Sequence, residues 1–351
     1  LGVRAPGIEK YGSLTTPDTV SLHAALADLA AVEVTHLAME ASSHGLDQYR
    51  LDSVAITAAG YTNLTRDHLD YHLTMEKYLA AKMRLFSDLL ERQGTAVLNA
   101  DDEFFEPIYK VSKESGHKII TYGEKGKDIK ILKRTLKPTG QDLSLSVFDQ
   151  QIDVTLPLVG QFQVMNALCA LGLVLAGDGD AQIITPLLAQ LQGVPGRLQQ
   201  IPGHPKGAAI YVDYAHKPGA IEAVLNALRS HTEGRLICLF GCGGNRDAGK
   251  RPIMGRIASG LADMVIVTDD NPRHEDPKLI RAAILEGAPD AEEFADRREA
   301  IHWAITQLKK GDVLVIAGKG HEQGQIIGDV VEPFDDVQVA KQAIEHLKIE
   351  A

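Results

Sequence analysis

Four consecutive residues, Asp270, Asn271, Pro272 and Arg273, have side chains and a position in the sequence that predict ligand binding. They follow residues 264–268, a short apolar run rich in β-branched side chains that predicts a buried parallel strand. In open α/β sheets, ligands bind at the carboxyl ends of the strands, where such a loop begins. Pro272 fixes the loop backbone, and the planar guanidinium of Arg273 suits a carboxylate held by two hydrogen bonds. The alternative is a turn anchored by proline with a solvated arginine.

Glu40 ends another apolar run, residues 35–40, which we predict to be a strand. Ser42 and Ser43 follow it, so a carboxylate and two hydroxyls come together at the end of a strand. This combination suits a hard cation or a ligand that carries phosphate. Helix capping by either serine is the alternative interpretation.

The segment 63–72 follows the predicted strand 56–61 and is rich in His, Asp and Arg, including His68. Such a density of ionisable groups at a strand end favours a site over a solvated loop. Lys82 lies in the predicted helix 75–91 among apolar neighbours, where lysines usually extend their ammonium group to water. If Lys82 were buried, its pKa would fall and its neutral amine could react with carbon dioxide, giving a carbamate that binds Mg²⁺.

Three polar residues could contact a nucleotide. Asn166, near the start of the predicted helix 163–176, could touch a base edge or simply cap the helix. Arg197 stands at a junction rich in Pro and Gly, from which it could reach a phosphate. Asp213 ends the predicted strand 208–212, a position from which carboxylates often hold ribose hydroxyls.

Two glycine-containing loops also follow predicted strands. The loop 241–252 has several glycines and then cations, which invites an anionic ligand. It is not a nucleotide phosphate loop, because Arg251 occupies the position of the required Ser or Thr. In the second loop, Gly318 permits close backbone approach and Glu322 could accept a hydrogen bond from an ammonium group.

Composition limits the class of protein. The chain has 351 residues with 44% hydrophobic content and a net charge of −11, which fits two globular domains and argues against nucleic acid as the main partner. The most apolar stretch, residues 164–176, is too short to span a bilayer. The three cysteines have no zinc-site spacing, so we expect a reducing cytoplasm.

Strand and helix patterns alternate along most of the chain, which predicts parallel sheets covered by helices. Residues 118–156 differ and predict a β-meander. Pro and Gly cluster at 193–196 and again soon after, which predicts a domain junction. Beyond this junction we expect four strands and four helices, at residues 208–212, 236–240, 264–268 and 313–317 and at residues 219–229, 252–261, 277–286 and 297–308.

In this order, the segments described above resemble the motifs of the Mur ligases, which form amide bonds in peptidoglycan synthesis at the expense of ATP. The resemblance runs from Thr15 to about Phe334. It implies an α/β fold with a central parallel-sheet domain of Mur-ligase type, here incomplete and with a small antiparallel β part. A smaller Rossmann-like C-terminal domain follows, and we place the two domains at residues 1–192 and 193–351.

The resemblance also implies a reaction. By resemblance, the expected reaction is the addition of meso-diaminopimelate to UDP-N-acetylmuramoyl-L-alanyl-D-glutamate through an acyl phosphate, with ATP and Mg²⁺ as cofactors. In the family, Asp-Asn-Pro-Arg accompanies diaminopimelate rather than L-lysine. Lysine lacks the second carboxylate and would leave the Arg273 guanidinium unpaired, at a cost of about 1–3 kcal/mol. We expect a cytoplasmic monomer that does not insert into membranes.

Matched motif by motif, the family's functional positions fall into four groups. The group that holds the UDP-linked substrate comprises Thr15, Thr16, Ser42, Gln48 and Arg50. The catalytic and metal-associated group comprises Glu40, His68 and Lys82, the last being the lysine that is carbamylated in the family. The nucleotide group comprises Asn166, Arg197 and Asp213. The group for the amino-acid acceptor comprises Arg246, Asp270, Asn271, Pro272, Arg273, Gly318 and Glu322.

The chain also departs from the family pattern. The family's phosphate loop, which ends Gly-Lys-Thr/Ser, lies before the position of Thr15 and is absent here, so we expect a fragment of a longer enzyme with little activity. Gln163 stands where the family commonly has Asn. A sibling ligase, either lysine-adding or of the folylpolyglutamate type, and a non-catalytic ligand-binding module are the alternatives. A Rossmann dehydrogenase is excluded because no G-x-G-x-x-G follows a first strand.

Overall fold

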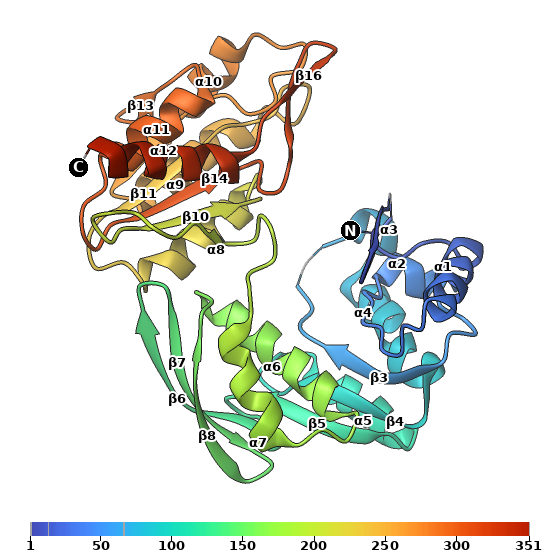
Figure 1. Cartoon of the computed structure of the whole chain (residues 1–351). Coiled ribbons are helices and arrows are strands. Elements are labelled where there is room, and N and C mark those ends of the chain that lie inside the picture. Colours follow the sequence, from blue (N-terminus) through green and yellow to red (C-terminus); the bar gives the residue numbers. More distant parts are fainter. Residues whose placement is uncertain (1, 13, 66, 351) are drawn as a thin grey trace. The chain divides into compact units, whose positions relative to one another are not determined.

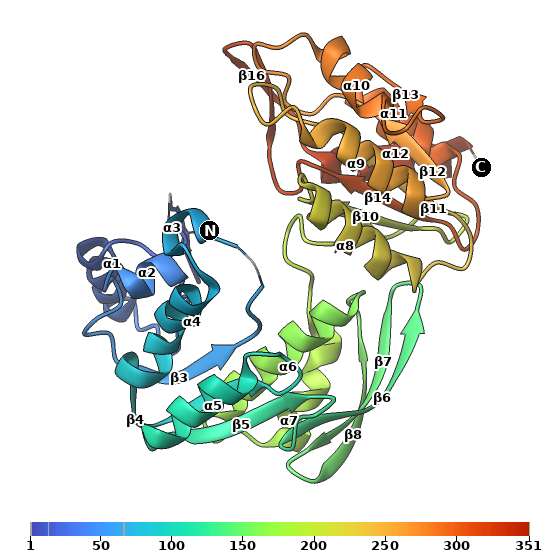
Figure 2. The same ribbon diagram turned by 180° about the vertical axis from the view of Figure 1, so that it is seen from behind.

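The computed structural model describes residues 2–12, 14–65 and 67–350, which form two units (Figure 1, Figure 2). The first unit comprises Leu1–Lys133, Leu143–Val154 and Met165–Leu188, and the second comprises Arg134–Asp142, Thr155–Val164 and Ala189–Ala351. The boundary near residue 189 lies close to the predicted junction, whereas the tip of a β-hairpin before it belongs to the second unit.

The second unit is built on a six-stranded sheet with the strand order β13-β12-β11-β14-β10-β9. Its strands are β9 (Gln199–Gln200), β10 (Ala209–Asp213), β11 (Leu236–Phe240), β12 (Met264–Val267), β13 (Glu292–Glu293) and β14 (Val313–Ala317). All neighbouring strands pair in parallel except β9, which is antiparallel to β10. The carboxyl ends of the parallel strands therefore meet along one edge.

Helices cover both faces of this sheet because successive strand residues point to opposite sides. Ala209 and Tyr211 pack with α8 (Pro218–Arg229), α9 (Lys250–Leu261) and α10 (Pro277–Leu285), which lie on the face turned to the viewer in Figure 2. Ile210 and Val212 pack with α11 (Arg297–Thr306) and α12 (Asp336–Glu350) on the face shown in Figure 1. The unit is therefore a doubly wound α/β sandwich, and the predicted Rossmann-like class is confirmed.

The predicted elements of this unit are found within a few residues of their expected ends. The strands at 236–240 and 313–317 have the predicted bounds. Asp276 and Asp296 cap α10 and α11 by accepting hydrogen bonds from backbone N–H groups, as acidic N-caps do. The sequence analysis missed α12 and a hairpin formed by β15 (Gly324–Ile327) and β16 (Val330–Pro333).

The first unit contains most of a second six-stranded sheet, ordered β3-β4-β5-β6-β7-β8. Its strands are β3 (Ile56–Tyr61), β4 (Leu90–Asn99), β5 (Lys118–Gly123), β6 (Ile129–Lys137), β7 (Gly140–Val147) and β8 (Gln150–Leu156). Strands β3 to β6 pair in parallel. The predicted meander is confirmed for β6 to β8, because Phe148 and Asp149 form a two-residue turn with φ of 46° and 65°, typical of an antiparallel hairpin.

The remaining elements of the chain are shorter or lie around this sheet. The strands are β1 (Gly2–Ala5) and β2 (Ile8–Tyr11), and the helices are α1 (Thr19–Ala31), α2 (Ser43–Asp47), α3 (Leu69–His72), α4 (Met75–Arg84), α5 (Phe105–Glu114), α6 (Gln161–Leu175) and α7 (Ala181–Ile184). A π-helical turn spans Leu85–Leu89, and a 3-10 helix spans Thr185–Gln190. The sequence analysis predicted α6 but not α5.

Two predictions about the first unit are wrong. Residues 35–40 form no strand: the segment has no paired neighbour in the described chain, and Leu37 is half exposed. The predicted helix 75–91 is too long, because the chain leaves helical geometry at Leu90, which is buried and begins β4 opposite Ile56. Glu40 therefore lies on an exposed loop rather than at a strand end.

All three cysteines are free and buried. Among the described residues, no helix combines the length and the apolar character needed to cross a bilayer.

Candidate functional site

A pocket of about 840 Å³ opens in the second unit, among the loops that follow β10, β11, β12 and β14. This is where the strand-end rule for open α/β sheets places a ligand. Its walls include six of the seven residues predicted for the amino-acid acceptor: Arg246, Asp270, Asn271, Arg273, Gly318 and Glu322. Pro272, the seventh, is buried beneath the loop. We call this cavity the acceptor pocket.

Glycines allow the loops around the pocket to approach one another. Gly244 N–H donates to Asn271 O at 2.9 Å, and a Cβ on Gly244 would collide with the carbonyl oxygen of Pro272. Gly318 has a φ of +113°, and a Cβ there would lie 2.7 Å from Oδ2 of Asp270. These two positions need glycine for the loops to pack as they do.

Arg273 is held by its backbone as well as by its side chain. It adopts the left-handed conformation, with a φ of 53°. Its N–H donates to Ile326 O at 2.9 Å, and its carbonyl accepts from Gly328 N at 2.7 Å, so the β15–β16 hairpin fixes the backbone of Arg273. The guanidinium donates through Nη1 to Gly244 O at 3.0 Å, which leaves Nη2 and Nε for a ligand.

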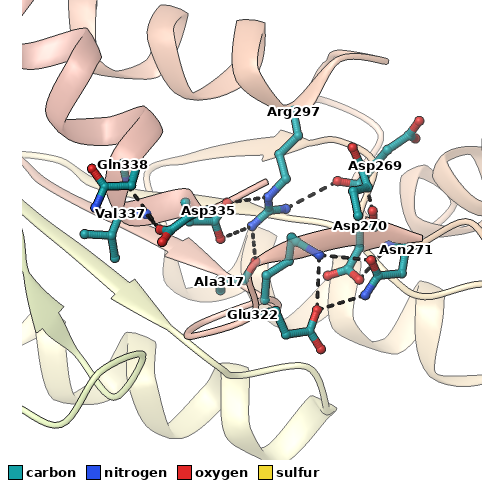
Figure 3. Close-up of polar contacts among 12 residues, drawn as sticks. Asp269, Asp270, Asn271, Arg297, Ala317, Glu322, Asp335, Val337 and Gln338 are labelled. Carbon is teal, nitrogen blue, oxygen red and sulfur yellow. Dashed lines mark hydrogen bonds and ion pairs between the residues drawn. The ribbon is translucent and has the colours of Figure 1, made fainter. Parts of the chain in front are cut away.

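The pocket contains charges of both signs. Four basic side chains line it (Lys217, Arg246, Lys250 and Arg273), together with three acidic ones (Asp247, Asp270 and Glu322). Figure 3 shows Asn271 and Glu322 turned toward each other, and Asn271 Nδ2 donates to Glu322 Oε2 at 2.9 Å. Separate anionic and cationic groups of this kind suit a zwitterion that carries both ammonium and carboxylate groups.

A buried ion pair lies behind the pocket wall. Arg297 donates to both carboxylate oxygens of Asp336, at 2.7 and 2.8 Å, and both side chains are fully buried. The same guanidinium donates to Ala317 O at 3.0 Å, as Figure 3 shows, and to Asp269 O at 3.4 Å. These carbonyls immediately precede Gly318 and Asp270, so Arg297 ties together two of the loops that form the pocket.

The residues predicted to contact a nucleotide lie in both units. In the second unit, Asp213 is buried and accepts from Leu198 N at 2.7 Å and Ala215 N at 2.8 Å. Burial raises the pKa of Asp213 despite these bonds. Arg197 is exposed, and its guanidinium lies 5.0 Å from the ring centre of Tyr214. Asn166 is exposed on α6 in the first unit.

The first unit brings together most of the residues predicted for the UDP-linked substrate. Thr16 Oγ1 donates to Glu40 O at 2.9 Å and accepts from Ser42 N at 2.9 Å. Arg50 donates to Thr16 O at 2.8 Å and to Gln48 Oε1 at 3.0 Å. Thr16 is buried, whereas the adjacent Thr15 is exposed. Ser42 also caps α2, as the alternative interpretation expected.

Glu40, His68 and Lys82 lie in the first unit, and Lys82 connects the other two: it shares Tyr78 with His68, and the charge of Glu40 acts on it. His68 and Lys82 both approach the ring of Tyr78, with centre distances of 6.0 Å from the His68 ring and 5.4 Å from Lys82 Nζ. Burial lowers the pKa of Lys82, and Glu40 acts in the opposite direction. Among the described residues, no three His, Cys, Asp or Glu side chains are placed to hold a metal ion.

Comparison with known proteins agrees with the predicted family. The family model described as "Mur ligase middle domain" matches residues 1–174, and "Mur ligase, glutamate ligase domain" matches residues 196–320. UDP-N-acetylmuramoyl-L-alanyl-D-glutamate–2,6-diaminopimelate ligase of Caulobacter vibrioides is 53% identical over 332 residues, which cover 95% of this chain and 68% of the relative. The chain belongs to the Mur ligase family.

Solved structures of Mur ligases share the fold. A structure of UDP-N-acetylmuramoyl-L-alanyl-D-glutamate–2,6-diaminopimelate ligase matches with a TM-score of 0.74 and 39% identity, covering 95% of this chain and 69% of the other. The MurF ligase of Thermotoga maritima in complex with ADP matches with a TM-score of 0.59 and 19% identity, covering 86% of this chain and 64% of the other. The predicted fold class and the prediction of a ligase are confirmed.

The sequence analysis missed pocket residues of this Mur ligase. Tyr214, His216 and Lys217 line the pocket after β10, and Lys250 lines it at the start of α9. All four fall within segments whose strand-end position was recognised, but only Lys250 received a role there, as one of the cations that would attract an anionic ligand. Lys319, between Gly318 and Gly320, was also overlooked, although a lysine two residues after a buried strand is a usable signal.

Proposed function

We propose that this Mur ligase joins meso-diaminopimelate to the D-glutamyl carboxyl of UDP-N-acetylmuramoyl-L-alanyl-D-glutamate, with ATP and Mg²⁺. The observation that carries the proposal is the acceptor pocket, in which Arg273 and Glu322 present opposite charges on separate walls. Diaminopimelate has two carboxylates and two amino groups. L-Lysine has only one carboxylate and leaves one cationic group of the pocket without a partner.

The pocket's own residues orient the acceptor. The free nitrogens of the Arg273 guanidinium suit the distal carboxylate, since Nη1 is already bound to Gly244 O. Glu322 and Asp270 can accept hydrogen bonds from the distal ammonium group. Arg246, which is exposed at the pocket wall, adds a second cation for carboxylate recognition. The amine that reacts is the one that these contacts leave free.

The first unit is proposed to hold the UDP-linked substrate and the metal. Thr15, Thr16, Ser42, Gln48 and Arg50 offer hydroxyl, amide and guanidinium groups on one loop system, a set suited to a peptide carboxylate and its amides. Mg²⁺ prefers oxygen ligands, and Glu40 is the only oxygen donor among the three predicted metal residues. Carbamylation of Lys82 would supply a further oxygen donor beside Glu40.

ATP is the proposed ligand of the nucleotide group of residues, Asn166, Arg197 and Asp213. Asp213, a buried carboxylate at a strand end, can accept hydrogen bonds from ribose hydroxyls, and the exposed Arg197 can donate to phosphate oxygens. When bound, ATP supplies the phosphoryl group that activates the glutamyl carboxyl as an acyl phosphate. The proposed location is the cytoplasm, where the nucleotide and the reduced cysteines are both expected.

The first test measures product mass and phosphate release with ATP, Mg²⁺, the UDP-linked dipeptide and either meso-diaminopimelate or L-lysine. The 351-residue chain is compared with the Caulobacter vibrioides relative, which serves as the positive control. We expect a product with diaminopimelate and little with L-lysine. Turnover with L-lysine alone would indicate the lysine-adding sibling. Ligand binding without turnover by this chain, under conditions in which the relative turns over, would indicate a binding module.

Replacing Arg273 tests the basis of the specificity. Arg273→Gln should reduce the preference for diaminopimelate over L-lysine by about 1–3 kcal/mol, roughly 5- to 150-fold in the ratio of kcat/KM values. Arg298→Gln is the matched control, because Arg298 is exposed on α11 and does not line the pocket. An unchanged preference in Arg273→Gln would refute the proposed contact with the second carboxylate.

A further inference from the structure

Lys319 is a fully buried lysine directly behind the acceptor pocket. It follows β14, and its side chain has an exposed fraction of 0%. Its Nζ donates to Asn271 Oδ1 at 2.9 Å, to Glu322 Oε2 at 3.1 Å and to Gly324 O at 2.7 Å. An ammonium group has three N–H donors, so every donor has an acceptor, as burial of a charge requires.

These bonds determine which end of the Asn271 amide faces Glu322. Oδ1 of Asn271 accepts from Lys319 and also from Ile326 N, at 2.9 Å. The reversed amide would place its NH₂ group against an ammonium and a backbone N–H, both of which are donors. Nδ2 therefore points to Glu322, and this orientation is the one shown in Figure 3.

Lys319 and Asn271 together fix the carboxylate of Glu322. Both of their bonds end on Oε2, which leaves Oε1 as the oxygen that can receive a hydrogen bond from a ligand. The side chain of Glu322 has an exposed fraction of 34% and lines the pocket. The bonds from Lys319 and Asn271 therefore fix the Glu322 side chain, and its second oxygen, Oε1, stays accessible from the pocket.

Lys319 and Arg297 are both buried cations, but they differ in the carboxylate that balances their charge. Arg297 is also fully buried, but it has its own buried counter-ion in Asp336. The only carboxylate that forms an ion pair with Lys319 in the described part of the chain is Glu322, which lines the pocket. The charge of Lys319 is therefore balanced by a group that also faces the ligand.

We propose that Lys319 is a positioning residue for the amino-acid acceptor. Its ammonium orients Asn271 and Glu322 so that Glu322 Oε1 and Asp270 receive the distal ammonium group of the acceptor. The inference rests on the proposed function for the identity of that acceptor. Lys319 itself is buried and acts only through these two side chains.

The test measures binding of meso-diaminopimelate to the full chain by calorimetry, with ADP, Mg²⁺ and the UDP-linked dipeptide present. Lys319→Met keeps the aliphatic stem and removes the ammonium, and it should weaken diaminopimelate binding by about 10- to 100-fold without changing ADP affinity. Lys341→Met, at an exposed position of α12 in the same unit, should change neither.

A double-variant cycle distinguishes positioning from a general structural role. If Lys319 acts through Glu322, Lys319→Met should weaken binding much less in a Glu322→Gln background than in the wild-type chain. The same fold-loss in both backgrounds would overturn the inference. Equal binding by the wild-type chain and Lys319→Met would also overturn it and leave the proposed function intact, whereas no binding by the wild-type chain would overturn both.

Thermal unfolding shows whether Lys319→Met folds. If it does not, Lys319→Gln replaces it, since the glutamine amide keeps uncharged donors for Asn271 or Gly324.

A second experiment uses NMR on the wild-type chain and therefore does not depend on whether a variant folds. The ¹⁵N-labelled ammonium of Lys319, assigned through its bonded carbons, should shift when diaminopimelate is added because its partner Glu322 gains a second ligand. An unshifted signal in the saturated complex would contradict the proposal.

Discussion

The acceptor pocket of the second unit and the Glu40–His68–Lys82 cluster of the first unit differ in how their side chains are held. In the pocket, Asn271 and Glu322 have protein partners on their buried side, and Arg273 is fixed at its backbone and its guanidinium. In the cluster, Glu40 and His68 are exposed, and Lys82 lies against an aromatic ring.

This difference indicates two ways of preparing a site. The pocket is ordered by hydrogen bonds within the protein, so a ligand meets groups that are already oriented and little side-chain entropy is lost on binding. The Glu40–His68–Lys82 cluster has few such bonds among the described residues, so its side chains are less firmly oriented by the protein itself. The predictions below test this contrast, beginning with the largest expected effect.

Removing Arg297 should strongly destabilise the second unit. Arg297→Met leaves the fully buried Asp336 without its counter-ion, and breaking such a pair costs about 3–5 kcal/mol. Urea unfolding of the chain should show this loss. The neighbouring Arg298→Met, which removes an exposed guanidinium from the same helix, should change the unfolding free energy by less than about 0.5 kcal/mol. A similar small change in both variants would show that the pocket does not depend on the buried pair.

His231 tests whether buried polar side chains outside the pocket are also fixed by hydrogen bonds within the protein. Its ring lies between the backbone of Gly160 and that of Lys137. His231 is buried, Gly160 N donates to its Nε2 at 3.1 Å, and its Nδ1 donates to Lys137 O at 2.7 Å, so the ring is neutral. Burial lowers the pKa of His231, and the bond to Lys137 opposes this. The unfolded chain therefore binds a proton near pH 6.5 that the folded chain does not bind until lower pH.

The stability contributed by neutral His231 is thus present above about pH 6.5 and is lost as the pH falls toward the folded-state pKa. His231→Gln keeps one donor and one acceptor but does not titrate. It should reduce the pH dependence of the unfolding free energy between pH 7 and 5, by at most about 1.4 kcal/mol per pH unit. Identical slopes in wild type and His231→Gln would contradict this prediction.

Carbamylation of Lys82 would add a carboxylate group to the Glu40–His68–Lys82 cluster, and it can be detected directly. Because burial lowers the pKa of Lys82, more of its amine is neutral near pH 8 than for an exposed lysine. A ¹³C carbamate resonance should appear with labelled bicarbonate, disappear in Lys82→Arg and persist in Lys77→Arg, an exposed position on the same helix. Since Glu40 acts to raise this pKa, Glu40→Gln should shift the appearance of the signal to lower pH.

The smallest effect is expected at His68. His68 is exposed and has a φ of 53°, which asparagine tolerates well, so His68→Asn should change the unfolding free energy by less than about 0.5 kcal/mol. His72→Asn is the contrasting variant, because His72 is buried, stacks on Tyr78 and contacts Ser43 Oγ at 2.9 Å. A large loss of stability in His68→Asn would show that the cluster is more tightly held than its contacts indicate.

The features that the sequence predicted well depend on local patterns. Strands 236–240 and 313–317 are short runs of apolar residues that a buried parallel strand requires, and both were found with the expected bounds. The strand-end rule indicated where a pocket would form, whereas the resemblance to the Mur ligases grouped Arg246, Asp270 and Glu322, and these three residues line one cavity.

The features that the sequence could not predict depend on distant neighbours. Residues 35–40 have the composition of a strand, but a strand exists only where another backbone pairs with it. Asp213 stands at a strand end as expected, yet its oxygens already accept from the backbone of Leu198 and Ala215. Lys319 is buried because Asn271 and Glu322 converge on it, which only the folded loops reveal.

The β15–β16 hairpin has a consequence for protein engineering. It contacts the acceptor loop through Gln325 Nε2, which donates to Asp270 O at 2.7 Å, and through the backbone bonds to Arg273. A transplant of residues 270–273 into a ligase with another acceptor would therefore separate the loop from the strand that shapes it. Residues 318–333, grafted together with that loop, form an exchangeable cassette that keeps the contacts between loop and hairpin, whereas the recipient would have to supply the bonds that Gly244 makes to Asn271 and Arg273.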